Sequence, residues 1–506
     1  MAIISTAVGI DRRSRVSGYK IKKGVFSNET TNLPQIIAVF GEANTANQSG
    51  LTVAKKEVTS AQEAAELYGF GSPIHQQMRI LRPNGSDGVG GIPTIVFPQI
   101  TAGGATATIR AWTVTGTATS NAVHTVIVNG RDNLDFQTYD FSIVTGDTPT
   151  IIAAKIADAV NAVLSSPAIG SAALAVATLT SKWKGITSAE LNVSFDNGGN
   201  SAGVTYAQTT STDGTGVVDL SASLAQFGDD WYTSVTNPYG TAQLTVLENF
   251  NGFPNPDNPT GRYSGLIFKP FLAYFGSTLQ DKDDIALITD AAARIEQCTN
   301  VLCPAPNSKG FTWEAVANVV ALFARRMQDT PHLDVNGFAY PDMPIPADSN
   351  IGDMSDYDNR DFLVKKGSST VMLENGVYKI QDLVSTYHPA GEVPLQYAYA
   401  RNLNLDWNVK DGYTTLEKLR LRDKVLVLDT QVVDVVGAIK PKEWKAVIFD
   451  YFDDLAEKAL INDPAFSKSS LLVQISTTNP DRFETFFRYK RTGIARIEST
   501  DAEAGF

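Results

Sequence analysis

A change of composition divides the 506-residue chain into parts that must fold differently. Between about residues 99 and 234, Thr, Ala, Gly, Ser and Val dominate, and short alternating runs are separated by turn residues such as Asn129-Gly130. On both sides, longer apolar runs alternate with segments of helical periodicity, which is typical of a mainly parallel sheet covered by helices. The sequence therefore predicts an α+β or α/β multidomain fold with an inserted β-rich domain.

Local signals predict the elements around the insertion. Residues 33–40 form a near-continuous apolar run, as in a strand covered on both faces. Ser60 and Glu63 have the spacing of a capping box, which predicts a short helix ending at Tyr68. Later in the chain the pattern predicts a strand at 266–275, a helix at 283–297, a strand at 301–303, a helix at 312–328 and an acidic loop at 336–360.

Composition and motif searches exclude several kinds of chemistry. A formal net charge of −12 disfavours direct binding to nucleic acid. No Gly is followed by Lys, so the phosphate-binding Walker loop is absent, and the zinc motif HExxH does not occur. We therefore expect no enzyme activity, no catalytic residue, no cofactor and no metal ligand. The acidic loop could still gather a calcium ion through Asp348, Asp353, Asp356, Asp358 and Asp361, although it lacks EF-hand spacing.

The cysteines and the hydropathy pattern indicate the cellular compartment in which the protein is made. Cys298 and Cys303 are the only cysteines and make a poor disulfide framework, which favours a reducing environment. The N-terminal residues lack the charge pattern of a secretory signal, and no run of about 18 apolar residues occurs. We expect a soluble protein made in the cytoplasm, with no membrane insertion.

Both ends of the sequence are suited to contact with other copies. Six cations lie within twelve positions of the N-terminal segment of this acidic protein, a pattern that fits a solvated basic arm and equally an arm that binds an acidic second copy: Arg12, Arg13, Arg15, Lys20, Lys22 and Lys23. Residues 483–498 read as a strand with no wholly polar face. An extended segment can add to the sheet edge of another molecule, and such head-to-tail contacts propagate into rings or helices.

The last third of the sequence contains a hairpin and an amphipathic helix. Asn375-Gly376 joins two β-type runs, 371–373 and 377–380, and is a strong hairpin signal. A helical region follows. Pro441 then opens a helix whose apolar stripe comprises Trp444, Val447, Ile448, Tyr451, Leu455 and Ala459.

The order of these features resembles the C-terminal domain of sheath proteins from contractile bacteriophage tails of the Mu-like kind. The resemblance rests on ENGVYKIQDLVSTY, a helical linker, the Pro-capped helix and NPDRFETFFRYKRTGIARIE, and extends upstream through FGDDWYTSVTNPYG. It implies a tail-sheath-like fold with extended N- and C-terminal arms. It also implies stacked hexameric rings that contract around an inner tail tube and drive it through the host envelope.

The resemblance further implies partners, a location and contact residues. The partners would be other copies, the inner tail tube protein, and the baseplate and tail terminator proteins, in a virion tail assembled in the host cytoplasm. Arm strands would lie within 15–25 and 485–497, and a receiving hairpin within 371–386. The arm residues are Lys20, Ile21, Lys22, Val25, Phe487, Arg488, Tyr489, Lys490, Ile494 and Arg496; the hairpin residues are Val371, Leu373, Val377, Tyr378 and Ile380; the tube-contact residues are Lys440, Lys442 and Lys445.

These features together predict a domain order and leave alternatives open. The expected order is an arm at 1–25, core at 26–98, an inserted outer domain at 99–237, core at 238–358, a tube-facing domain at 359–484 and an arm at 485–506. The alternatives are a tube or fibre component, the sheath of a related contractile injection system, and a hydrolase that uses two carboxylates of the acidic loop. A sheath subunit should polymerise, whereas a hydrolase should remain a discrete particle.

Overall fold

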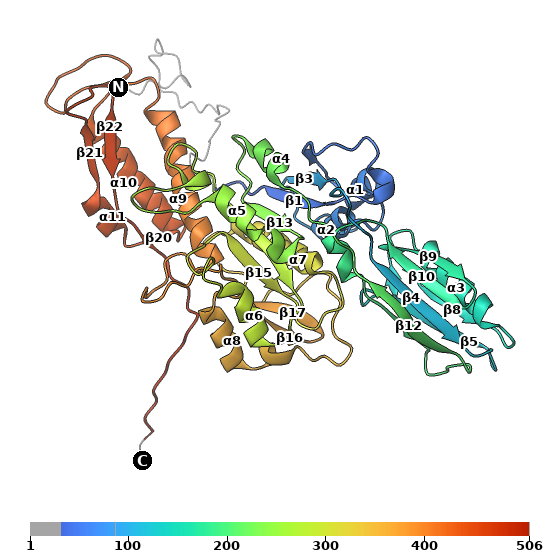
Figure 1. Ribbon diagram of the computed structural model, residues 1–506. Coiled ribbons are helices and arrows are strands. Elements are labelled where there is room, and N and C mark those ends of the chain that lie inside the picture. The colour runs from blue at the N-terminus through green and yellow to red at the C-terminus, as the bar shows by residue number, and fades with distance from the viewer. Residues whose placement is uncertain (1–31, 87, 505–506) are drawn as a thin grey trace, which may run out of the picture.

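The protein is a mixed α+β multidomain chain. A computed structural model describes residues 32–86 and 88–504. A central sheet lies in the middle of the molecule, an inserted β-rich unit extends from it on one side, and a group of C-terminal helices lies on the other (Figure 1).

The central sheet is mainly parallel, as the sequence pattern predicts. Its order is β15-β14-β13-β1-β3-β2, in which all pairs are parallel except that of the short edge strand β2. Every residue of β1 is buried, which fits the apolar run that the sequence shows there, although the strand begins at Ile37 and extends past that run to the buried Glu42. The strands are β1 (Ile37–Glu42), β2 (Lys56–Glu57), β3 (Thr94–Gln99), β13 (Ser234–Asn237), β14 (Leu272–Ser277) and β15 (Asn300–Pro304).

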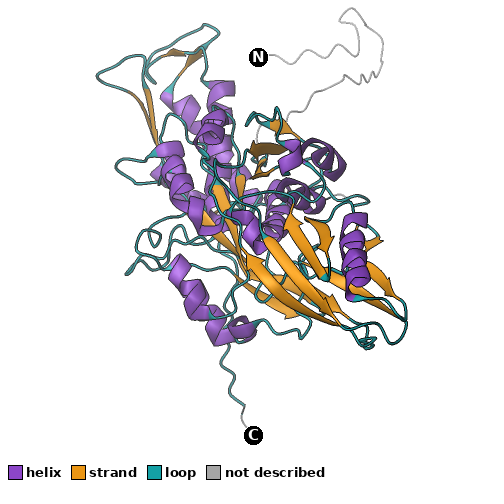
Figure 2. Cartoon of the chain, turned by 45° about the vertical axis from the view of Figure 1, so that its right-hand side comes forward, coloured by secondary structure: helices purple, strands orange, loops and turns teal. Residues whose placement is uncertain are grey.

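Helices cover both faces of this sheet (Figure 2). On one face, α2 (Pro73–Leu81) and α7 (Thr312–Asp329) pack together, and α1 (Ala61–Tyr68) packs on α2. On the other face, α4 (Ser221–Leu224) and α5 (Leu244–Asn251) contribute to a cluster centred on Phe227. The predicted N-cap of α1 is confirmed, because the backbone N–H of Glu63 donates to Ser60 Oγ at 3.1 Å. The Glu63 carboxylate accepts from the N–H of Thr59 at 3.0 Å instead of that of Ser60, so the second bond of the predicted capping box is shifted by one residue.

Three predictions of local structure are wrong, because distant contacts decide them. The helix predicted at 283–297 is α6 (Lys282–Thr289) and ends before Asp290, whose carboxylate binds Lys366 and His388. The strand predicted from residue 266 begins only at Leu272, since residues before it form turns around Arg262. The predicted loop at 336–360 contains a 3-10 turn and the first residues of α8 (Tyr357–Lys365), which Asp356 caps.

The inserted unit has two larger antiparallel sheets, the short two-stranded sheet β6–β7 and its own core. The larger sheets have the orders β12-β4-β10-β9 and β11-β5-β8, and α3 (Pro149–Ala162) packs on them with Thr148 as its N-cap. The backbone N–H of Thr106 donates to Thr215 O at 3.0 Å, so the chain enters and leaves the unit side by side. The strands are β4 (Ile109–Thr115), β5 (Ala122–Val128), β6 (Asn133–Leu134), β7 (Gln137–Thr138), β8 (Asp140–Ile143), β9 (Ala168–Ala173), β10 (Val176–Ser181), β11 (Val193–Asp196) and β12 (Thr205–Thr212).

The C-terminal helices enclose a further core. Trp444, Ile448, Tyr451 and Leu455 are buried and confirm the apolar stripe, whereas Ala459 lies beyond the helix end. We call the group from α9 onward the C-terminal module. Its elements are α9 (Ala400–Arg420), β18 (Val425–Leu426), β19 (Ala438–Ile439), α10 (Pro441–Glu457), β20 (Ile461–Asn462), α11 (Pro464–Ser470), β21 (Leu472–Ile475), β22 (Phe483–Phe486) and β23 (Lys490–Arg491).

Candidate assembly surfaces

The predicted N-terminal arm residues lie outside the described residues: Lys20, Ile21, Lys22 and Val25. The first described residues contact two helices. Asn32 Nδ2 donates to Gln328 O of α7 at 3.0 Å, and the backbone N–H of Leu33 donates to Asn408 Oδ1 of α9 at 2.7 Å. The chain therefore reaches β1 between the central body and the C-terminal module.

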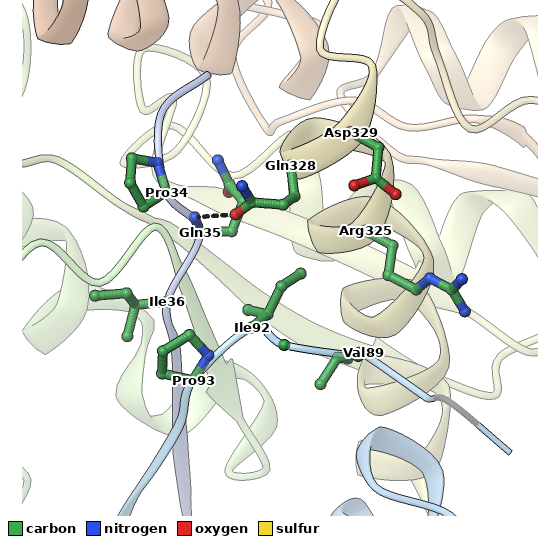
Figure 3. Close-up of a pocket in the computed structure, with 11 residues that line it drawn as sticks. Pro34, Gln35, Ile36, Val89, Ile92, Pro93, Arg325, Gln328 and Asp329 are labelled. Atoms are coloured by element: carbon green, nitrogen blue, oxygen red, sulfur yellow. Dashed lines mark hydrogen bonds between the residues drawn. The ribbon is translucent and has the colours of Figure 1, made fainter. Parts of the chain in front are cut away.

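A cavity of about 510 Å³ lies beside this point (Figure 3). It is bounded by the segments that lead into β1 and β3 and by the last turn of α7. Its walls carry the apolar side chains of Ile36, Val89 and Ile92, with Arg325 and Asp329 at α7. Among the described residues that line it there is no Ser, Cys or His.

The C-terminal segment, residues 483–498, lies against its own chain. Regular strand pairing is limited to β22, which pairs with β21, and β23, which pairs with β20. Phe487 enters the core of the C-terminal module, with ring centroids 5.3 Å from those of Tyr413 and of Phe452. Arg488 and Lys490 point to solvent, in the alternation expected of an extended segment.

Two polar anchors hold the rest of this segment. Asp406 of α9 accepts hydrogen bonds from Tyr489 Oη at 2.8 Å and from Arg491 Nε at 2.7 Å. Burial raises the pKa of the Tyr489 hydroxyl well above its ordinary value, so this group donates at any physiological pH. Farther along, Ile494 is half-buried, and Arg496 pairs with Asp334 and stacks 3.8 Å from the Tyr399 ring centroid.

The predicted receiving hairpin is present as β16 (Thr370–Glu374) and β17 (Val377–Asp382). Val371, Tyr378 and Ile380 are buried in the main core, whereas Leu373 and Val377 are half-buried. The outer edge of β17 is already bonded, because Gly337 N donates to Ile380 O at 2.7 Å and Tyr340 N donates to Tyr378 O at 2.8 Å. A further strand could not join the hairpin along β17 without displacing residues 337–340.

Sequence reasoning missed a second hairpin, formed by β21 and β22. These strands pair with each other and with no other described strand, and Leu472 and Phe486 are more than half exposed. The apolar run at 471–475 and the turn residues Asn479-Pro480 could have indicated it.

The three predicted tube-contact lysines gather at the start of α10. Lys440 is the N-cap residue, Lys442 is exposed, and Lys445 Nζ lies 5.5 Å from the Phe449 ring centroid. The Glu443 carboxylate accepts a hydrogen bond from the backbone N–H of Lys440 at 3.0 Å and places one negative charge in the first turn.

The carboxylates of the acidic region serve separate local contacts. Asp353 accepts a hydrogen bond from Lys282 N, Asp356 caps α8, and Asp361 pairs with Lys365. Within 32–86 and 88–504, no group of three or more His, Cys, Asp or Glu is placed to hold a metal ion. In the same described ranges, no helix combines the length and apolarity needed to cross a bilayer.

The contact between the inserted unit and the core contains three groups with shifted pKa values: Glu42 is fully buried, and Glu190 and Lys182 are half-buried. Burial raises the pKa of Glu42 and of Glu190 to about 7 each, and lowers the pKa of Lys182 to about 8. Thr187 Oγ1 donates to Glu42 Oε1 at 2.9 Å, and Glu190 accepts the first N–H of α7, from Thr312, at 2.7 Å. These contacts fix the inserted unit on the carboxyl end of β1 and the start of α7.

An ion-pair network and an aromatic cluster complete this contact. Arg131 binds Glu314 at 3.0 Å and Asp342 at 2.6 Å. The rings of Trp183, Phe311 and Trp313 pack together, fully enclosed between the two units.

Comparison with known proteins finds similarity to tail sheath proteins, while no protein-family model matches the chain. The Mu-like prophage FluMu tail sheath protein of Haemophilus influenzae (strain ATCC 51907 / DSM 11121 / KW20 / Rd) is 24% identical over 194 residues. The match spans 38% of this chain and 38% of that protein. Among solved structures, a sheath tail protein from Desulfitobacterium hafniense superposes with a TM-score of 0.44 and 11% identity, covering 94% of this chain and 100% of that one.

Proposed function

We propose that this chain is the structural subunit of a contractile tail sheath of the Mu-like kind. The observation that carries the proposal is the similarity to the FluMu tail sheath protein over 194 residues. A C-terminal segment whose regular strand pairing is limited to β22 and β23 supports it, because a terminal segment of this kind can exchange between copies. In this proposal the subunit has no enzymatic role.

The proposed assembly is a helical stack of hexameric rings around an inner tail tube. Segments 15–25 and 485–497 join sheets of neighbouring copies, so the rings stay connected while the bodies rotate during contraction. The receiving edge is either the β16–β17 hairpin or the β21–β22 hairpin, and the unpaired edges of the second favour it. The Lys440 end of α10 contacts the tube, and baseplate and terminator proteins close the stack in the virion.

The same proposal divides the chain by role. Residues 26–98 and 238–358 form the sheath core, 99–237 the outer domain, 359–484 the tube-facing domain, and 1–25 and 485–506 the arms. In this proposal the outer domain lies on the outer surface of the sheath, where insertions are tolerated.

Negative-stain electron microscopy of the full-length protein at rising concentration tests the proposal. We expect hollow tubes or stacked rings from the intact chain, alone or co-expressed with the tube protein encoded beside it. Removal of residues 1–25 should leave a folded monomer that no longer polymerises. Small discrete particles under all conditions, with the tube protein present, would overturn the proposed function.

A further inference from the structure

One aromatic side chain of the inserted unit is held out into solvent. Phe136 lies at the turn of the β6–β7 hairpin and is 102% exposed, compared with 60% for Tyr357 and 52% for Phe486. Its φ is 64°, and Asp135 before it has a φ of 48°, a backbone conformation in which a bulky side chain is strained. The exposed ring and the strained backbone both cost free energy, and residues of this kind are typical of contact sites.

The β6–β7 hairpin holds this ring in one place. Asp135 Oδ1 accepts a hydrogen bond from Arg79 Nε of α2 at 3.0 Å, and Asp135 Oδ2 accepts one from Ser165 Oγ. On the other strand, Gln137 Oε1 accepts a hydrogen bond from the backbone N–H of Leu164 at 2.8 Å. The turn is therefore fixed to the central body as well as to the inserted unit. A ring presented in this way loses little conformational entropy when it binds.

The cavity beside β1 has the chemistry of a site for an aromatic ring (Figure 3). Its apolar lining residues are Pro34, Ile36, Val89, Ile92 and Pro93. Arg325 lies at its edge, where its Nη1 donates to Gly88 O at 3.0 Å. A guanidinium group binds favourably to the face of an aromatic ring. With a volume of about 510 Å³, the cavity is large enough for a phenylalanine side chain.

Gly91 offers a way to cover the cavity by substitution. This residue lines the cavity, and a Cβ atom added to it would meet no atom within 4 Å. Its φ is not positive, so a larger residue can adopt the same backbone conformation without strain. A side chain placed there can therefore occupy the cavity without displacing its walls.

Phe136 does not reach the cavity of its own chain. The inserted unit contacts Glu314 in the first turn of α7, whereas Arg325 and Asp329 of the cavity belong to the last turns of that helix. The ring is fully exposed, and its hairpin is fixed by the contacts described above. A contact between the ring of one copy and the cavity of the next joins two different surfaces, so it is heterologous and propagates.

We propose that Phe136 of one subunit inserts into the cavity beside β1 of a second copy of this chain. The inference rests on the proposed self-assembly and adds to it a contact between subunit bodies that does not involve the terminal arms. Burial of the ring supplies the affinity, and the apolar walls together with Arg325 select an aromatic side chain.

Substitutions on the two sides test this contact separately. Phe136→Gly removes the ring, and Gly91→Leu covers the cavity. The matched controls are Leu174→Gly and Gly103→Leu. Leu174 is also a turn residue of the inserted unit, with a φ of 53° and an exposed fraction of 81%, and an added Cβ at Gly103 would likewise meet no atom within 4 Å. Sedimentation and electron microscopy measure polymer formation, and thermal unfolding of the dilute protein checks the fold.

We expect Phe136→Gly and Gly91→Leu each to raise the concentration needed for polymerisation by about tenfold or more, because the ring is no longer buried between copies. The two controls should leave that concentration unchanged. The melting temperature of the dilute Phe136→Gly variant should not fall, since Gly adopts a positive φ without strain. Loss of assembly without loss of stability distinguishes a contact residue from one that is needed only for folding.

Cross-linking between two variants identifies the partners directly. Phe136→Cys and Gly91→Cys are mixed, polymerised at high concentration and treated with a short thiol-specific cross-linker. The natural Cys298 and Cys303 are fully buried and do not compete. We expect a covalent dimer from this mixture and none from a mixture of Leu174→Cys with Gly91→Cys.

The outcomes separate this contact from the proposed function. Absence of the covalent dimer in the polymer, or normal polymerisation of Phe136→Gly, would overturn the inference while leaving the proposed function intact. If Gly91→Leu blocks polymerisation but Phe136→Gly does not, the cavity holds another segment, such as the residues before Asn32, and the inference is wrong. If the unaltered chain does not polymerise even with the tube protein, both the inference and the proposed function are wrong.

Discussion

Glu42 is a buried carboxylate at the contact between the core and the inserted unit. Its pKa is about 7 in the folded protein against an ordinary 4.5, because burial disfavours the ionised form. The stability that its protonated form contributes is therefore complete below pH 4.5 and is lost as the pH rises to 7.

Glu42→Gln should consequently stabilise the protein at pH 8, by on the order of 3 kcal/mol, and make little difference at pH 4.5. Glutamine keeps an oxygen that can accept the Thr187 hydrogen bond and carries no charge. Thermal unfolding at the two pH values measures the effect, and the exposed Glu57→Gln is the control. An unchanged melting temperature at pH 8 would contradict the assigned pKa.

At the scale of elements, the Asp406 carboxylate of α9 anchors the C-terminal segment at two residues, Tyr489 and Arg491. Arg491→Met removes charge-assisted bonds to Asp406 at a site where both side chains are about four-fifths buried, which should cost about 1–3 kcal/mol. Backbone amides of β22 and β23 should then exchange hydrogen at least tenfold faster. Lys490→Met is the matched control, because its ion pair with Asp463 is about half exposed and should contribute less than about 1 kcal/mol. Equal exchange in the two variants would show that the aromatic contacts alone hold the segment.

Elements with strong local signals could be predicted, and those decided by distant partners could not. Signals from neighbouring residues were enough to predict three features: the apolar run at 33–40, the Ser60 cap and the helix α7. The end of α6 depends on Lys366 and His388, which are 76 and 98 positions from Asp290. The anchor of Arg491 on Asp406 likewise joins residues 85 positions apart, so no local pattern could identify it.

At the scale of the whole molecule, the inserted unit has the properties of an independent domain. It has its own core, and its two connections to the body are hydrogen-bonded together. Residues 105–216 expressed alone should therefore fold cooperatively, which circular dichroism and thermal unfolding would measure. Because Trp183 loses its partners Phe311 and Trp313, the isolated unit should bind a hydrophobic dye more than the intact chain does. A non-cooperative melt would show that the core is needed to fold it.

The hydrogen-bonded connecting segments at Thr106 and Thr215 have a consequence for how such a protein can diversify. Since both connections leave the body at one point, the core closes equally well around a large domain, a small one or a short turn. At this position, therefore, the inserted domain can be exchanged for another one while the central sheet stays the same. Only the core residues that contact the inserted domain, such as Glu42 and Trp313, would have to change with it.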